Sequence, residues 1–227
     1  MIEPFTYIIY ASPLVVAFGA LASRALTLSG VIVGLIMSYA ILHYQGPFWL
    51  ALLYVFFFAG MLATRFKESV KKKLKVAQKT RTYSNALANA GLATVMAYMG
   101  NFYGFMGAFA AATGDTLSSE VGMLSKRSPV MITTLRRVKT GTNGGITLLG
   151  TAASVLGGLV IGLAAYPIVP EAKTIYIAVM AGFIGSAIDS FIGATLENRN
   201  MIKNWATNFI CTVGGAGTAI IFGNVLA

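Results

Sequence analysis

Acidic residues are scarce in this chain, and two of them stand within a long apolar segment. Asp115 and Glu120 belong to the stretch "GDTLSSEVG", together with Ser118 and Ser119. A charged side chain at the centre of a membrane costs about 2.5–3.5 kcal/mol on insertion scales. Carboxylates at such positions therefore indicate a functional site, whereas hydroxyls and amides are explained about equally well as hydrogen bonds between helices.

A second acidic stripe occurs further along the chain, where polar residues recur at helical spacing on one face: Ser186, Asp189, Ser190, Gly193 and Glu197. Amide side chains lie toward the same end of two other apolar segments, at Asn89 and Asn208. Carboxylate and hydroxyl oxygens suit Mg²⁺, which typically takes one or two carboxylates together with substrate phosphates. We therefore expect a divalent metal that is held for a phosphorylated ligand, with Asp115 and Asp189 at its site. Glu120 and Glu197 lie nearer the membrane interface, where simple solvation explains them about equally well.

A basic, glycine-rich turn is the third feature with chemical potential. The stretch "RRVKTGTNGG" ends at Gly145 and is not a Walker A loop, because no Gly-Lys-Ser/Thr closes it. A turn that opens a helix presents backbone N–H groups and a positive helix end to phosphate, and we expect Thr142 or Asn143 to cap that helix. Such a turn is often only a connection between a loop and a closely packed helix. Here the adjacent basic side chains and the facing carboxylates favour a site that binds phosphate. The residues expected to bind substrate or nucleotide phosphate are Arg136, Arg137, Lys139, Gly141, Thr142, Asn143, Gly144, Gly145, Ser119, Asn89, Ser186 and Asn208.

The elements that must position these residues are membrane helices. Of 227 residues, 56% are hydrophobic and only 11% are charged, against about 25% charged residues in soluble domains. The single cysteine and the single histidine exclude an internal disulfide and a cysteine-rich or multi-histidine metal site. A net charge of +10 would suggest nucleic acid in a soluble protein. Here the basic residues cluster in short loops, so membrane orientation explains them and we expect no nucleic-acid partner.

Apolar spans predict an all-α polytopic membrane helix bundle of about eight transmembrane helices, at residues 5–22, 26–42, 47–64, 84–99, 102–122, 144–165, 174–196 and 205–226. The second and fourth spans are short, which leaves six or seven helices open. If the basic loop after the third span is cytoplasmic, strict alternation puts every lysine and arginine except Lys173 on that side. We predict one integral membrane domain over residues 1–227, with N-terminal apolar helices (1–64), a basic cytoplasmic loop (65–83) and helices that carry the polar site (84–227).

Together, the blocks "GDTLSSEVG", "GTNGGIT" and "GSAIDSFIGATLE" resemble the integral membrane family that includes plant and cyanobacterial phytyl-phosphate kinase and the animal transmembrane-protein-19 type. The resemblance runs from Ser84 to the C-terminus. It implies Mg²⁺-dependent phosphoryl transfer from a nucleotide, CTP, to an isoprenoid phosphate such as phytyl or geranylgeranyl phosphate. On this resemblance, Asp115, Glu120 and Asp189 are expected to be the catalytic residues and the ligands of the Mg²⁺ ion. The apolar spans and the basic loops predict a multi-pass protein of the cell membrane whose active site faces the cytoplasm. The family is distantly similar to CTP-dependent polyprenol kinases and CDP-diacylglycerol synthase, but the long signature of the latter is absent.

Other functions remain open at the level of the residues. Asp115 and Asp189 could couple ions to a solute in a transporter, although no internal repeat is evident and the polar groups gather at one end. A CTP-dependent prenol kinase or cytidylyltransferase would use a similar site, and a non-catalytic scaffold could recruit anionic lipids through the basic loop. The expected partners are a nucleoside triphosphate, an isoprenoid phosphate and membrane lipid, and the sequence leaves a homodimer open.

Overall fold

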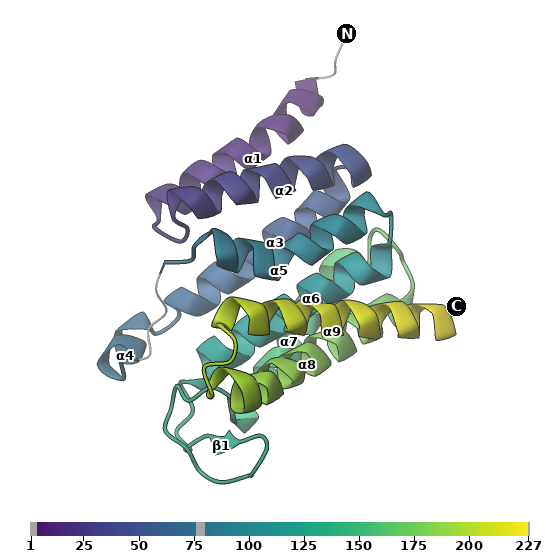
Figure 1. Ribbon diagram of the computed structural model, residues 1–227. Helices are drawn as coiled ribbons and strands as arrows, with labels where there is room; N and C mark the ends of the chain where they lie inside the picture. The colour runs from purple at the N-terminus through teal and green to yellow at the C-terminus, as the bar shows by residue number, and fades with distance from the viewer. Residues whose placement is uncertain (1–3, 76–79, 227) are drawn as a thin grey trace.

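The computed structural model describes residues 4–75 and 80–226, and these form a bundle of long helices joined mostly by short loops (Figure 1). The rest of the predicted domain, including residues 76–79 of the predicted basic loop, lies outside the described residues. The long helices are α1 (Pro4–Ala22), α2 (Leu28–Gln45), α3 (Pro47–Arg65), α5 (Tyr83–Tyr98), α6 (Phe102–Gly122), α7 (Leu148–Ala165), α8 (Ala172–Ile192) and α9 (Asn204–Val225). The shorter elements are α4 (Glu68–Lys73), the π-helical turn η1 (Gly193–Glu197) and the antiparallel strands β1 (Val130–Met131) and β2 (Gly145–Ile146).

This architecture confirms the predicted all-α polytopic membrane bundle. Within residues 4–75 and 80–226, each predicted span overlaps one long helix, including the two short spans. By length and composition, five helices in this part of the chain could cross a membrane: α2, α3, α7, α8 with its continuation η1, and α9. The predicted span 144–165 begins late, at Leu148, because the preceding residues pair in β2.

Capping side chains explain where several helices begin. The Asn101 side chain accepts a hydrogen bond from the Gly104 N–H at 2.8 Å and starts α6. Thr147 accepts from the Gly150 N–H at 3.0 Å and starts α7. The prediction that Thr142 or Asn143 caps this helix is therefore wrong, since the glycine turn and β2 separate them from the first helical residue.

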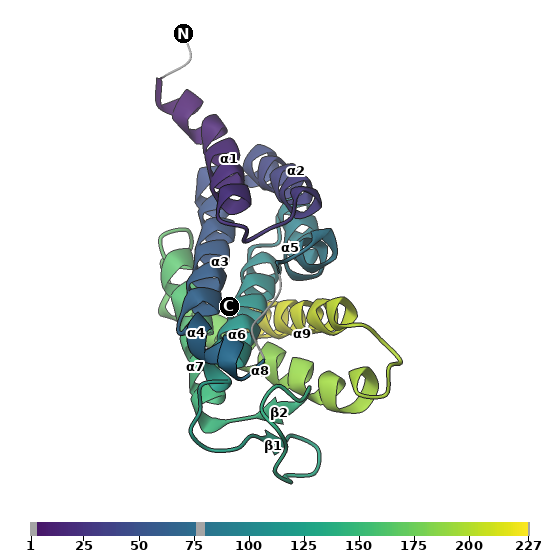
Figure 2. The ribbon, with the colours of Figure 1, turned by 90° about the vertical axis from the view of Figure 1, so that its left-hand side faces the viewer.

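Helix α6 lies at the centre of the bundle, packed against α3, α5, α7, α8 and α9 (Figure 2). Every residue from Gly104 to Gly114 is buried, so the helix is enclosed on all sides. Small residues permit this, because a β-carbon at Gly114 would lie 2.6 Å from the carbonyl oxygen of Gly182 in α8. Ala111 likewise lies against Gly185. One turn further along both helices, the same packing brings Asp115 beside Asp189.

The loops that carry the basic residues meet at one end of the bundle, here called the basic end. Leu26 and Arg81 form a β-bridge between the α1–α2 loop and the segment before α5. The Arg65 guanidinium donates to the Ser23 carbonyl at 3.1 Å. At the opposite end, Lys173 donates to the Leu226 carbonyl at 3.2 Å, near the C-terminus. The connectivity therefore agrees with the alternation expected from the basic loops, and the cytoplasmic orientation of this end stays a prediction.

Gly182→Val tests the close helix packing. The added side chain would press on the α7 backbone, since a β-carbon there already lies 2.8 Å from the Cα of Gly158. We expect the free energy of unfolding to fall by about 1–3 kcal/mol or more. Thermal unfolding in detergent is the measurement. Gly91→Val is the matched control, because a β-carbon at Gly91 meets no atom within 4 Å. Equal stability of the two variants would contradict the proposed packing.

Candidate functional site

A polar cavity of about 240 Å³ lies at the basic end, between α5, α6, α7, α8 and α9. Its walls carry carboxylates, amides, hydroxyls and the backbone of the glycine turn: Asp115, Asp189, Glu197, Asn85, Asn89, Asn204, Asn208, Ser118, Ser119, Ser190 and residues 140–145. The structure thus brings together most of the predicted site residues, although they come from four helices and the α6–α7 loop. The expectation that the acidic stripes and the glycine turn face one cavity is met.

Asp115 and Asp189 form the acidic centre of this cavity. Their carboxyl groups are close enough to interact directly. One oxygen of Asp189, Oδ1, is buried and is without a hydrogen-bond partner among the described residues. Two adjacent carboxylates repel each other unless a proton or a cation is shared between them, and a buried carboxylate oxygen left without a partner is costly. The pair is therefore suited to binding a cation.

The π-helical turn η1 places a further carboxylate at the rim. Glu197 ends this turn and lines the cavity, and its Oε2 accepts a hydrogen bond from the Thr207 hydroxyl at 3.1 Å. π turns are rare and often occur at functional sites. Nevertheless, residues 4–75 and 80–226 contain no group of three or more His, Cys, Asp or Glu side chains arranged to hold a metal. The predicted three-carboxylate cluster is therefore replaced by a pair of aspartates, and any bound ion would need oxygens from a ligand.

The glycine turn folds over the end of α8. Gly141 and Gly144 have positive φ angles of 88° and 77°, which side-chain-bearing residues rarely adopt. Gly144 packs so closely on Ala194 of η1 that a β-carbon there would collide with it. The Asn198 side chain donates to the Asn143 carbonyl at 3.0 Å and holds the turn in place. The turn, together with Thr147 and Gly150 at the start of α7, therefore lines the same cavity as the two aspartates.

Four predicted phosphate-binding residues do not line the cavity. Arg136, Arg137 and Lys139 are exposed on the α6–α7 loop, and none of them belongs to the cavity wall. The strand β1 pairs with β2 and bridges to Arg137, so the basic segment runs on the outer side of the glycine turn. Ser186 is buried in α8 between helices rather than at the cavity surface. The three basic residues were predicted to bind phosphate because they precede the turn in sequence, but their side chains do not reach the cavity wall.

Arg81 is the one cation among the described residues that lines the polar cavity, and the sequence pattern did not predict it. Its backbone is fixed by two hydrogen bonds, from its N–H to the Ala25 carbonyl at 3.3 Å and from the Thr27 N–H to its own carbonyl at 3.0 Å. Its guanidinium lies against α3, where a β-carbon at Gly60 would be 3.2 Å from Nη1. Burial lowers the pKa of Arg81, while nearby Glu120 and Asp115 act in the opposite direction.

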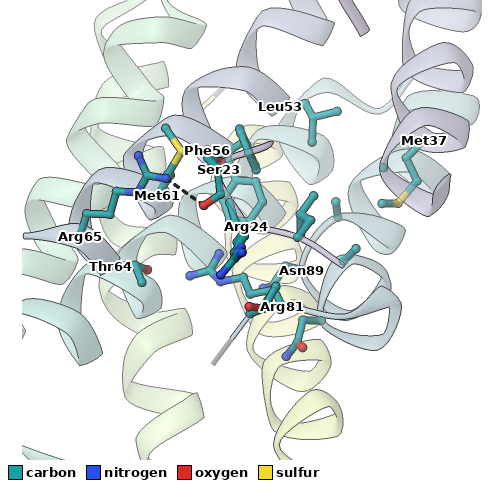
Figure 3. A pocket seen from close by; sticks show the side chains of 18 of the residues that line it. Ser23, Arg24, Met37, Leu53, Phe56, Met61, Thr64, Arg65, Arg81 and Asn89 are labelled. Atoms are coloured by element: carbon teal, nitrogen blue, oxygen red, sulfur yellow. Dashed lines mark hydrogen bonds between the residues drawn. The ribbon is translucent and has the colours of Figure 1, made fainter. Parts of the chain in front are cut away.

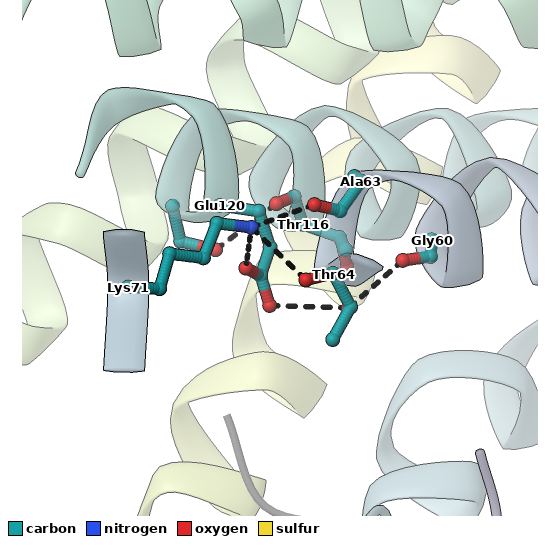
Figure 4. A network of polar contacts seen from close by, with 7 residues as sticks. Gly60, Ala63, Thr64, Lys71, Thr116 and Glu120 are labelled. Carbon is teal, nitrogen blue, oxygen red and sulfur yellow. Dashed lines mark hydrogen bonds and ion pairs between the residues drawn. The ribbon is translucent and has the colours of Figure 1, made fainter. Parts of the chain in front are cut away.

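Glu120 does not line the polar cavity and instead holds α4 (Figure 4). It forms an ion pair with Lys71, whose side chain is only 1% exposed. The Lys71 ammonium also donates to the carbonyls of Ala63 at 2.7 Å and Thr64 at 3.2 Å. The Thr64 hydroxyl donates to the other carboxylate oxygen of Glu120 at 3.1 Å. The expected grouping of Glu120 with the two aspartates is therefore corrected, because α6 presents it on the side that faces α3 and α4.

Comparisons with known proteins place the chain in a family. Residues 11–216 match the family described as integral membrane protein DUF92. The chain belongs to this family. This DUF92 protein is 37% identical over 199 residues to an uncharacterized membrane protein of Methanocaldococcus jannaschii, covering 85% of this chain and 84% of that protein. It is 32% identical over 220 residues to Protein PGR of Arabidopsis thaliana, covering 80% of this chain and 75% of that protein.

A more distant relative is Protein VTE6, chloroplastic, of Arabidopsis thaliana, which is 26% identical over 176 residues. That match covers 70% of the DUF92 chain and 52% of the relative. No solved structure matches the chain. The family recognised from the three sequence blocks is thereby confirmed, and the protein is an integral, multi-pass membrane protein.

Removing either partner of the Lys71–Glu120 pair should destabilise the protein. Lys71→Met or Glu120→Met leaves one buried charge uncompensated, which typically costs about 3–5 kcal/mol. The double variant Lys71→Met/Glu120→Met removes both charges and should recover much of that loss. Thermal unfolding of the three variants in detergent measures the coupling. Unchanged stability of both single variants would show that the pair does not anchor α4.

Proposed function

We propose that this protein is a membrane phosphotransferase that moves a phosphoryl group from a nucleotide, CTP, to an isoprenoid phosphate such as phytyl or geranylgeranyl phosphate. The observation that carries the proposal is that an aspartate pair, a glycine turn and the start of a helix line one and the same cavity. The resemblance of the three blocks to phytyl-phosphate kinases supports the same chemistry. Phosphoryl transfer depends mainly on positioning and on charge neutralisation, and this cavity offers groups for both.

Asp115 and Asp189 would hold Mg²⁺, because they supply adjacent oxygens, one of which has no other partner among the described residues. Mg²⁺ usually binds one or two carboxylates and completes its shell with water and substrate phosphates. When bound, the ion would offset the negative charge of the nucleotide phosphates. Glu197 at the rim is held by Thr207 and would add negative charge near the same position.

The phosphate oxygens would contact the opposite wall. Helices α5, α7 and α9 begin at the basic end, so their positive ends point toward the cavity, whereas α6 and α8 end there. The backbone of residues 141–145 can approach a phosphate closely, and Arg81 supplies a permanent positive charge. At about 240 Å³, the cavity is smaller than the 300–1,000 Å³ typical of sites that enclose a drug-sized ligand. It suits a triphosphate whose nucleoside extends toward the α6–α7 loop.

In the reaction, an oxygen of the acceptor phosphate forms a bond to the γ-phosphorus, and the bond from that phosphorus to the β-phosphate oxygen breaks. The products are an isoprenoid diphosphate and a nucleoside diphosphate. The acceptor oxygen is already ionised, so no general base is required. The residues then act by holding the two phosphates in line and by stabilising the charge that develops between them. We further propose that the basic end faces the cytoplasm at the cell membrane, where nucleotides are available.

Asp115→Asn and Asp189→Asn should each lower the Mg²⁺-dependent formation of isoprenoid diphosphate by at least about a hundredfold. Each substitution removes an oxygen charge from the proposed ion site while keeping the side-chain size. The assay uses purified protein with radiolabelled CTP or ATP, Mg²⁺ and geranylgeranyl phosphate. Glu171→Gln, at the opposite end of the bundle, is the matched control and should retain activity. Full activity of either aspartate variant would rule out the ion site, and solute uptake without phosphotransfer would favour a transporter.

Arg81 should matter for nucleotide binding, while Arg136 should not. Arg81→Gln removes a charge from the cavity wall, and we expect the KM for the nucleotide to rise about tenfold, as for loss of a charge-assisted hydrogen bond. Arg136→Gln alters an exposed loop residue outside that wall and should leave KM nearly unchanged. Initial rates at varied nucleotide concentration measure both. A larger rise in KM for Arg136→Gln than for Arg81→Gln would instead identify the basic segment of the α6–α7 loop as the phosphate site.

A further inference from the structure

A second, larger cavity of about 370 Å³ lies beside the polar one, walled by α2, α3 and α5 (Figure 3). Its inner part is apolar and is formed by Met37, Leu53, Phe56, Phe57, Met61 and Ala90. From Arg65 at the mouth to Leu53 in the interior, the wall follows twelve residues of α3, or about 18 Å at the rise of an α-helix. The cavity therefore reaches from the basic end well into the apolar part of the bundle.

The mouth of this second cavity is basic. Arg24, Arg65 and Arg81 all line the cavity, and each comes from a different segment of the chain. Arg24 and Arg65 are exposed, whereas Arg81 is half-buried and also lies near Glu120 and Asp115. One acid, Glu68, also lies there, but Lys72 pairs with it at 2.6 Å. Arginine binds phosphate through several fixed N–H groups, and three guanidinium groups at one opening favour a dianionic headgroup over a neutral lipid.

The two cavities share a wall. Arg81, Asn85 and Asn89 line both of them, and the first of these side chains extends between α3 and α6. An anion held at the basic mouth would consequently lie next to the cavity that contains Asp115 and Asp189. An apolar channel whose basic mouth can bind an anion, and which lies against the polar cavity, has the form required to bind an amphiphilic acceptor.

We propose that this second cavity binds the acceptor substrate: one isoprenoid chain lies along α2, α3 and α5, and its terminal monophosphate contacts Arg24, Arg65 and Arg81. The inference rests on the proposed function for what happens to the bound phosphate, namely its phosphorylation. Binding of the lipid itself needs no nucleotide. The volume is near the lower end of the range for ligand pockets, which fits one chain rather than the two chains of a membrane phospholipid.

The test is photocrosslinking with a geranylgeranyl monophosphate analogue that carries a diazirine in its hydrocarbon tail. Purified full-length protein is irradiated without nucleotide, and the labelled peptides are mapped by mass spectrometry. We expect labels on α2, α3 and α5, in the segments that contain Met37, Leu53 and Met61. Unmodified geranylgeranyl phosphate should compete, whereas inorganic phosphate and dioleoyl phosphatidate should not.

Gly34→Phe is the matched cavity-filling variant. A β-carbon at Gly34, which lines the cavity, meets no atom within 4 Å, so the ring can enter the channel without displacing the backbone. We expect the apparent affinity for the probe to fall at least about tenfold, with Mg²⁺-dependent CTP binding unchanged. Gly217→Phe is the control, because that position on α9 is equally open and lines neither cavity. Arg24→Gln/Arg65→Gln should weaken probe binding by a similar factor and leave the labelled segments the same.

The outcomes separate the inference from the proposed function. Labels on α2, α3 and α5 without any phosphotransfer would support the lipid-binding cavity and contradict the proposed phosphotransferase function. Phosphotransfer with labels confined to α7, α8 or α9 would keep the kinase and overturn the lipid site. Equal competition by phosphatidate would identify a phospholipid site and also overturn the inference, as would unchanged probe affinity in Gly34→Phe when that variant is folded.

Discussion

Backbone contact between the central helices is the constraint on which the rest of this structure depends. Gly114, Gly157 and Gly182 let α6, α7 and α8 approach until backbone atoms touch. In a membrane, such packing replaces the hydrophobic effect as the main source of helix association. It also fixes the rotation of α6 and α8 about their axes, so that Asp115 and Asp189 lie side by side one turn beyond the contact of Ala111 with Gly185. The aspartate pair is therefore positioned by glycines, which have no reactive side chain.

The polarity of the helices then sorts charge around this pair. Helices that end at the basic end contribute the acids, and helices that begin there contribute amides and backbone donors. Arg81 enters this arrangement from a loop that is fixed to the α1–α2 connection. Lys71 neutralises Glu120 on the opposite side of α6 and attaches α4 to the bundle. One helix thus serves a polar cavity on one face and a structural ion pair on another, and the second cavity adjoins the first through Arg81, Asn85 and Asn89.

Some of this could be read from the sequence because the membrane imposes simple rules. Apolar length sets where a helix crosses, and the basic loops set which ends lie together, so the helices and their alternation were predictable. The cost of a carboxylate in hydrocarbon singled out Asp115 and Asp189, and the glycine turn was recognisable from its composition. These predictions depend on local composition and on the lipid environment, which a linear pattern records.

Only the tertiary structure decided which side of each helix and loop faces the cavity. Asp115 and Glu120 are five residues apart, more than a full helical turn, and lie on different faces of α6. The basic segment beside the glycine turn points outward because β1 and β2 fold it back, whereas Arg81, distant in sequence, reaches inward. Such assignments depend on helix rotation and loop docking, which arise from contacts between segments far apart in the chain. The sequence alone determined that a polar site exists at the basic end, and the packing determined its members.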